Sequence, residues 1–138
     1  MASTRLYEAE QSLSQIAANS AAIASGDLVA LSGWFVIKAI NTTVRPLTGV
    51  ANGSITVAAN NQTVDKLKVS YTRLEPPDTR FEYVPSADIV QADVGKFYGL
   101  TAAGLVDVAT ASATIAAGSV VRLEAVLAAR KGVFIVVS

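Results

Sequence analysis

Charged residues of both signs crowd around a Pro-Pro pair, and acid–base chemistry would use residues of this type. The acids are Glu75, Asp78 and Glu82, and two arginines, Arg73 and Arg80, are interleaved with them. A hydrolase with paired carboxylates needs two acids flanking the bond, one with its pKa raised by burial. Neighbouring arginines instead hold carboxyl pKa values down. We therefore expect an ion-pair loop here, not a catalytic pair.

The chain contains no histidine and no cysteine. Serine and cysteine nucleophiles commonly need a histidine base, and zinc, haem and iron–sulfur sites are built from histidine and cysteine ligands. The sequence therefore predicts no catalytic residues, no metal site and no cofactor. We expect that the protein is not an enzyme.

Gly95-Lys96 has the residue types of a phosphate-binding loop but not the spacing. Such a loop needs glycine at position 90 and serine or threonine after the lysine, where this chain has Val90 and Phe97. We therefore expect no nucleotide site.

Three Asn-x-Ser/Thr sequons begin at Asn41, Asn52 and Asn61. Asparagine is also a common turn residue, and we interpret all three as turn chemistry.

The elements that position these residues are expected to be strands. Valine, isoleucine and threonine, which fit a pleated sheet better than a helix, make up 37 of 138 residues. Apolar and polar side chains alternate over Leu67–Thr72 and again over Val121–Leu127, which predicts two half-buried strands. The final run, Val133–Val137, is apolar throughout, so we expect it in the interior or in a subunit interface.

Glycines mark the turns between these short strands. Ser32-Gly33 separates the apolar run Leu28–Leu31 from Trp34–Ile40, and Asn52-Gly53 predicts a hairpin because both of its residues tolerate a positive φ. Short strands with frequent turns predict an all-β fold, either a small β-barrel or a sandwich. One short helical turn is expected near residues 87–92.

The N-terminal segment has a different pattern. Its apolar and small residues recur at alternating spacings of three and four, from Leu6 through Leu13 and Ile16 to Ile23, which is helical periodicity. The segment is also rich in serine, and Gly26 ends it, so a short helix and an extended arm both remain open. We expect residues 1–22 to form this arm or helix and residues 23–138 to form one β-rich domain.

Composition indicates association with other proteins. Charged residues are 16% of the chain against a usual ~25%, apolar residues are 51%, and the formal net charge is zero. Low net charge favours association, and a neutral chain lacks the basic excess of nucleic-acid binders. The longest uncharged run, Pro46–Val64, is interrupted by glycine and asparagine, so we expect no membrane span.

Two stretches resemble a known family. Ile23–Leu31 with Phe35–Ala39, and Ser86–Leu100 followed by Leu105–Val108, are similar to the head decoration (cement) proteins of tailed bacteriophages. The likeness covers roughly residues 23–138. It implies a β-rich structural protein, commonly a homotrimer, that binds the major capsid protein on the outer surface of the virion. Such a protein is made in the host cytoplasm and stabilises the shell against internal DNA pressure.

The resemblance implies no catalytic residues. It implies that Gly26, Asp27, Asp93, Gly95 and Lys96 are turn residues. We expect no nucleic-acid, membrane or small-molecule partner.

Candidate interface residues come from exposed or unexplained apolar positions and from nearby cations. We expect Leu6, Leu13 and Ile16 to grip a capsid subunit or a neighbouring copy, and Trp34, Phe134 and Ile135 to form the trimer seam. Arg45 and Arg80 are the expected cations at the rim of that surface.

Two other classes of protein fit the same composition. One is a different phage structural β-module, such as a tail-tube or fibre-like component, which forms rings or filaments. The other is a small ligand- or carbohydrate-binding β-barrel, which requires a concave site with convergent polar groups.

Overall fold

The computed structural model describes residues 12–43, 47–74 and 79–137, and within these the chain is mainly β. Three antiparallel sheets are present and none is closed into a barrel, which confirms the all-β prediction. The strands are β1 (Ser12–Ile16), β2 (Ala22–Ile23), β3 (Leu28–Ser32), β4 (Phe35–Lys38), β5 (Gly49–Ala51), β6 (Ile55–Thr56), β7 (Lys68–Arg73), β8 (Arg80–Tyr83), β9 (Phe97–Leu100), β10 (Val106–Ser112), β11 (Val121–Ala128) and β12 (Lys131–Val136). A π-helix, η1 (Asn61–Asp65), and a 3-10 turn, η2 (Gln91–Asp93), complete the described elements.

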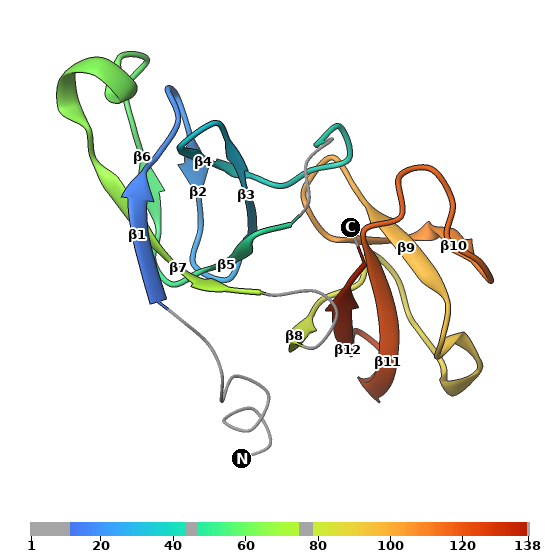
Figure 1. Ribbon diagram of the computed structural model, residues 1–138. Helices are drawn as coiled ribbons and strands as arrows, with labels where there is room; N and C mark the ends of the chain where they lie inside the picture. The colour runs from blue at the N-terminus through green and yellow to red at the C-terminus, as the bar shows by residue number, and fades with distance from the viewer. Residues whose placement is uncertain (1–11, 44–46, 75–78, 138) are drawn as a thin grey trace. The chain divides into compact units, whose positions relative to one another are not determined.

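The described chain divides into two compact units (Figure 1). The N-terminal unit holds residues 12–39 and 47–74, and the C-terminal unit holds residues 40–43 and 79–137. The boundary predicted at residue 22 does not separate these units, because residues on both sides of it lie in the N-terminal unit.

The N-terminal unit is built on a five-stranded sheet with the order β1-β7-β5-β3-β4. A short sheet of β2 and β6 lies in the same unit. A single parallel bridge between Ala17 and Val36 links the chain after β1 to β4 at the other edge of the larger sheet. The helical alternative for the N-terminal segment is wrong where the structure describes it, because Ser12–Ile16 pairs with β7 as a strand.

The core of the N-terminal unit consists mainly of small aliphatic side chains. Its buried members are Ala17, Ile23, Val29, Val36, Ala51, Val57, Val69 and Tyr71. The predicted alternation is confirmed within β7, since Val69 and Tyr71 are buried while Lys68 and Ser70 are exposed. It fails at Leu67, which directly precedes the strand and is exposed.

A buried amide links β1 to the segment before β7. The Asn61 side chain is fully buried, and its Nδ2 donates to the carbonyl oxygens of Ala17 at 2.7 Å and Leu67 at 3.1 Å. Its Oδ1 accepts a hydrogen bond from the Leu67 amide at 2.9 Å. This third sequon asparagine is therefore structural, and its side chain is inaccessible in the folded chain.

The hairpin predicted at Asn52-Gly53 is wrong. The strands on either side of it, β5 and β6, lie in different sheets, where β5 pairs with β3 and β7 and β6 pairs with β2. Asn52 instead accepts a hydrogen bond from the Thr72 hydroxyl at 2.9 Å, so its side chain fixes a bend against β7. Sequence alone identified the change of direction but not the partner strands.

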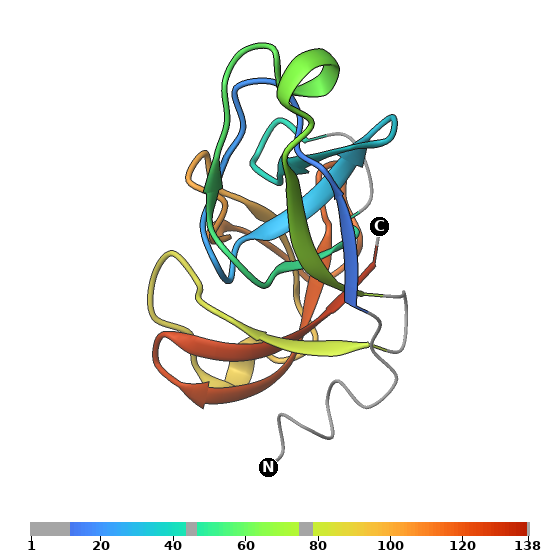
Figure 2. The same ribbon diagram turned by 90° about the vertical axis from the view of Figure 1, so that its left-hand side faces the viewer.

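The C-terminal unit is also built on a five-stranded sheet, with the order β10-β9-β11-β12-β8. A parallel bridge between Pro85 and Val106 links the chain after β8 to β10. The helical turn expected near residues 87–92 is present as η2, beside the β11–β12 hairpin (Figure 2). The Ile89 amide donates to the Ala129 carbonyl at 2.7 Å and fixes this turn against the hairpin.

The core of the C-terminal unit is aromatic. Phe81, Tyr98 and Phe134 are buried, and the Phe134 ring contacts the other two with centroid separations of 6.2 and 6.4 Å. The alternation predicted along β11 holds through Leu123 but fails at Leu127, which is exposed. Two register shifts in the β11–β12 ladder, each of the kind that a β-bulge produces, alter the facing of the residues beyond Leu123.

Candidate functional site

Trp34 stands at the tip of the β3–β4 hairpin with 80% of its surface exposed. Ser32 pairs with Phe35, so only Gly33 and Trp34 make the turn. Gly33 has φ +63°, which a two-residue turn with glycine in first position requires. The turn geometry therefore projects the single tryptophan of the chain away from its own sheet.

Phe134 and Ile135 are buried in the chain's own fold, contrary to their predicted place on a surface seam. Phe134 lies in the aromatic core, and Ile135 on the opposite face of β12 is 6% exposed. The apolar run at the C-terminus is thus explained within one chain, without a subunit interface.

A layer of charged side chains covers the second face of β12. Ile135 is paired with Arg80 on β8 and Arg122 on β11, and Val133 is paired with Glu82 on β8. Side chains directly opposite each other on neighbouring strands share one face of the sheet. The aliphatic stems of these long side chains therefore lie over the apolar side chains of β12.

Glu124 is the centre of this charged layer. Its Oε2 receives the Arg122 Nε at 2.8 Å and Nη2 at 2.7 Å, and its Oε1 lies 3.7 Å from Nη2 of Arg80. Lys131 and Glu82 form a second pair at 3.0 Å. The ion pairs predicted around the Pro-Pro turn thus exist for Arg80 and Glu82, but their partners are strand residues far away in sequence.

The other predicted interface residues have mixed outcomes. Leu13 and Ile16 are half-buried strand residues, and Leu13 packs against the aliphatic core of the N-terminal unit. They are part of the sheet and not of a free arm. Leu6 and Arg45 lie outside the described residues.

Asp93 is held in place by its own turn. Its carboxylate accepts a hydrogen bond from the Val90 amide at 3.0 Å and pairs with Lys96 at 3.0 Å. The backbone hydrogen bond, followed by the lysine, lowers the pKa of this carboxyl. These contacts make Asp93 a turn residue, as the resemblance implies.

Two tyrosine hydroxyls are buried. Tyr71 donates to Oε1 of Gln15, whereas the Tyr98 hydroxyl has no hydrogen-bond partner among the residues that the structure describes. Burial raises the pKa of both phenols; Arg73 opposes the shift for Tyr71, and Asp93 adds to it for Tyr98. Both groups are neutral at physiological pH and serve as core residues.

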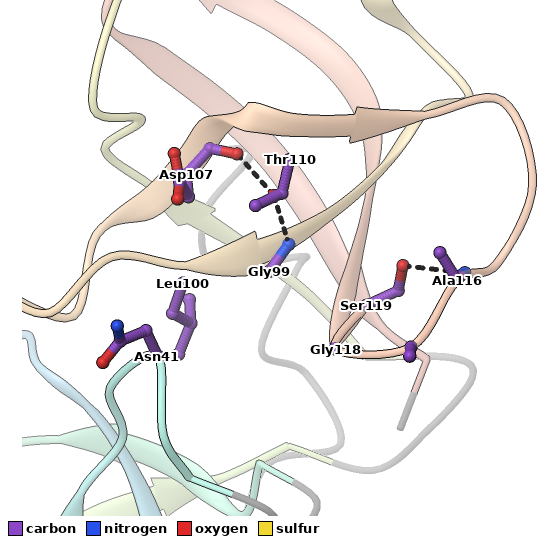
Figure 3. Close-up of a pocket in the computed structure, with 9 residues that line it drawn as sticks. Asn41, Gly99, Leu100, Asp107, Thr110, Ala116, Gly118 and Ser119 are labelled. Atoms are coloured by element: carbon purple, nitrogen blue, oxygen red, sulfur yellow. Dashed lines mark hydrogen bonds between the residues drawn. The ribbon is translucent and has the colours of Figure 1, made fainter.

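The C-terminal unit contains a cavity with polar walls, of about 250 Å³ (Figure 3). Gly99, Asp107 and Thr110 form one side, and the loop Ala116–Ser119 and Asn41 form the rest. The Gly99 amide donates to Oγ1 of Thr110 at 2.8 Å, and this hydroxyl donates to the Asp107 carbonyl at 2.7 Å.

This cavity depends on the absence of a side chain at Gly99. A Cβ there would lie 2.9 Å from the Gly118 carbonyl oxygen, so glycine lets the loop approach β9. Small-molecule sites usually occupy ~300–1,000 Å³, and this cavity is smaller. Its polar groups are largely engaged with one another, so it does not favour the ligand-binding alternative.

Over residues 12–43, 47–74 and 79–137, no cluster of three or more potential metal ligands occurs. No helix in that part of the chain has the length and apolar character needed to cross a bilayer.

Comparison with known proteins finds no matching family model and no matching curated protein.

Sequence reasoning missed Glu124 and the cavity. Arg122 and Glu124 are two residues apart on a strand, a spacing that places side chains on one face, so their pairing had a signal. No sequence signal predicts that Arg80 also approaches Glu124, because that contact depends on the order of the strands. The cavity depends on residues from four separate segments, and no local sequence pattern predicts it.

Proposed function

We propose that this protein is a structural component that works by associating with other proteins, and specifically a capsid decoration protein of a tailed bacteriophage. The proposal rests on the sequence resemblance and on one structural observation, the exposed Trp34. It is a non-catalytic role, in which the chain binds the outer surface of an assembled shell through the major capsid protein.

Trp34 supports this role because a tryptophan projecting from a hairpin tip is costly to leave in water. Burying an aromatic side chain removes ~150–250 Å² from water, which at ~25 cal/mol per Å² stabilises a complex by about 4–6 kcal/mol before the costs of association. Tryptophan is also enriched among residues that dominate binding energy. The rigid two-residue turn limits the entropy lost on docking.

The mechanism is thermodynamic linkage. A protein that binds the assembled shell but not free capsid subunits stabilises the shell by an amount that grows with its concentration. If the chain forms a trimer, three attachment points raise the avidity above that of a single contact. The low charge of the chain suits such burial between neighbours.

The first test is binding to empty capsid shells, measured by co-sedimentation, together with the temperature at which the shells collapse. The wild-type chain should co-sediment and raise that temperature. Trp34→Ala should weaken binding at least tenfold, Trp34→Phe should weaken it less, and the control Val64→Ala, also at an exposed apolar side chain, should bind normally.

Two outcomes contradict the proposal. A wild-type chain that does not bind shells removes the decoration role. Equal binding by Trp34→Ala and the wild type removes the tryptophan from the interface.

A further inference from the structure

The two units share one strand order. In each five-stranded sheet the strands can be ranked along the chain, β1, β3, β4, β5 and β7 in the N-terminal unit and β8, β9, β10, β11 and β12 in the C-terminal unit. In both sheets the first strand pairs with the fifth, the fifth with the fourth, the fourth with the second, and the second with the third, always antiparallel. In both, a parallel bridge joins the chain after the first strand to the third strand.

The register of these ladders is also shared. Setting the bridge residues Ala17 and Pro85 as equivalent places the ladders of one unit on their counterparts in the other. The exception is the β9–β10 ladder beyond Asp107, where a register shift pairs Phe97 with Ser112. The matched cross-strand pairs include Leu13–Tyr71 with Phe81–Phe134, Ala51–Tyr71 with Leu123–Phe134, Leu28–Val50 with Phe97–Arg122, and Leu31–Val36 with Leu100–Val106.

Backbone hydrogen bonds outside the regular strands repeat in the same places. In each matched pair, equivalent amides donate to equivalent carbonyl oxygens. Three pairs involve the second strand or the turn before it: Gly26 to Ala51 matches Gly95 to Leu123 (both 2.8 Å), Ala51 to Asp27 (2.8 Å) matches Leu123 to Lys96 (3.0 Å), and Thr48 to Val29 matches Val120 to Tyr98 (both 2.9 Å). Two further pairs follow the fifth and first strands: Leu74 to Thr48 matches Val137 to Val120 (both 2.8 Å), and Ala18 to Val36 (2.9 Å) matches Ser86 to Val106 (2.7 Å).

One turn glycine is repeated with its conformation. Gly26 has φ +91° and lies two residues before β3, and Gly95 has φ +94° and lies two residues before β9. Both amides donate to the fourth strand of their own unit. A positive φ favours glycine, so this backbone feature keeps its residue type where the neighbouring side chains differ.

We infer that the chain is a tandem of two copies of one five-stranded module. General rules of chain connection restrict strand order, but they do not dictate the register of four ladders or the position of a left-handed glycine. The sequence hides the repeat because few of the matched positions keep their residue type. Leu31 and Leu100 are identical, as are Val36 and Val106, but most matched residues differ. Tyr71 corresponds to Phe134, Val29 to Tyr98, and Ala51 to Leu123.

This inference deepens the proposed function, and its functional consequence rests on that proposal. In both modules an exposed apolar side chain lies where the fourth strand of the sheet leads to the fifth: Leu67, directly before β7, in one, and Leu127, near the end of β11, in the other. A surface made of repeated protein subunits offers the same site many times. Two linked modules can occupy two such sites, with an avidity above that of either alone.

The repeat is tested in solution by NMR of the full chain, through amide exchange and cross-strand proton contacts. We expect protected amides in matched pairs, at Gly26 and Gly95 and at Ala18 and Ser86, and close contacts across both parallel bridges. Outside the register shift that follows Asp107, a register in one unit displaced by even one residue from its counterpart overturns the inference.

Matched glycine variants give a second readout. Neither Gly26 nor Gly95 has a neighbour that an added Cβ would meet, so alanine acts only through the positive φ. Gly26→Ala and Gly95→Ala should each shift the unfolding equilibrium of their own unit by a similar factor, roughly 5- to 30-fold. The control is Gly53→Ala, which also has open space and should be near neutral. A large effect at one glycine and none at the other contradicts equivalence.

The two-site consequence is tested on empty capsid shells with Leu67→Glu, Leu127→Glu and the double variant, against the control Ile115→Glu, which lies outside both connections. We expect each single variant to weaken binding and the double variant to abolish it. If wild type binds and both single variants bind equally well, two-site binding is wrong. If wild type does not bind at all, the proposed function fails while the NMR result still decides the repeat.

Discussion

The two units solve the same folding problem with different side chains. The N-terminal unit packs small aliphatic residues and carries a buried amide, Asn61, whereas the C-terminal unit packs three aromatic rings. The large residue of the fifth strand is accommodated differently too. In the N-terminal unit, Gly49 on the fourth strand leaves room for the Tyr71 ring. In the C-terminal unit, Gly132 on the fifth strand itself leaves room for the Phe134 ring. The same arrangement of strands thus accommodates two different sets of core side chains, provided that the side-chain volume is conserved locally.

The surfaces of the units differ more than their backbones. The hairpin between the second and third strands carries Trp34 in the N-terminal unit, and its counterpart in the C-terminal unit, after Thr101, contains alanines and a glycine. The C-terminal unit instead has a charged layer over β12 and a cavity beside β9. We therefore expect the residues that perform the function to lie where the two units differ, and the residues that stabilise the fold to lie where they agree.

The largest effect is expected from the aromatic core. Phe134→Ala removes a fully buried ring that contacts Phe81 and Tyr98, and such truncations cost about 3–5 kcal/mol. Urea unfolding monitored by circular dichroism measures this change. A loss below about 1 kcal/mol would mean that the rings do not form the core of this unit.

The buried amide of the N-terminal unit comes next. Asn61→Ala leaves the Ala17 carbonyl and the Leu67 amide without their side-chain partner, and buried unsatisfied groups cost about 1–3 kcal/mol each. We expect a loss of about 2–3 kcal/mol in urea unfolding. The neighbouring exposed Asn60→Ala is the control, and equal values for the two variants would contradict the bridging role of Asn61.

The charged layer should contribute less. Glu124→Gln removes the carboxylate shared by Arg80 and Arg122, and partly exposed pairs of this kind contribute up to about 1 kcal/mol. The loss should shrink as salt is raised, because screening weakens the wild-type pairs. A loss that is independent of salt would show that Glu124 acts through packing instead.

The stability is expected to depend on pH at both ends of the scale, through Asp93 of the C-terminal unit in acid and through one tyrosine of each unit in alkali. The pKa of Asp93 is lowered in the fold, so its stabilisation is present above its unfolded value near 4 and is lost as pH falls through the folded value. The pKa values of Tyr71 and Tyr98 are raised, so their stabilisation is present below about 10 and is lost as pH rises beyond it.

These expectations are checked by unfolding across pH. Asp93→Asn should flatten only the acid limb, and ultraviolet titration of phenolate should find two late-titrating tyrosines. If Asp93→Asn leaves the loss of stability at low pH unchanged, that loss comes from other carboxylates.

Much of the fold follows from local pattern, and its limits are physical. Alternation predicts the facing of β7 and half of β11, and the uniform apolar run predicts the interior place of β12. Which strands pair is not a local property, so the hairpin at Asn52-Gly53 is wrong and the helical periodicity around Leu13 gives way to pairing with β7. Tertiary pairing decides such segments because a single apolar face suits either element.

The candidate site follows the same division. The exposure of Trp34 follows from a glycine turn beside it, whereas the burial of Phe134 and Ile135 depends on which strands flank β12. The repeat was invisible in the sequence because register and turn geometry persist while side chains change.

The central claim, association through Trp34, is tested most directly by the fluorescence of this single tryptophan, recorded with light-scattering mass over a dilution series and on addition of empty capsid shells. The account predicts emission at long wavelength, typical of indole in water, for the free chain. On self-association or shell binding it predicts a shift to shorter wavelength together with the rise in mass. A rise in mass with unchanged emission, or a monomer at every concentration that also ignores shells, would contradict it.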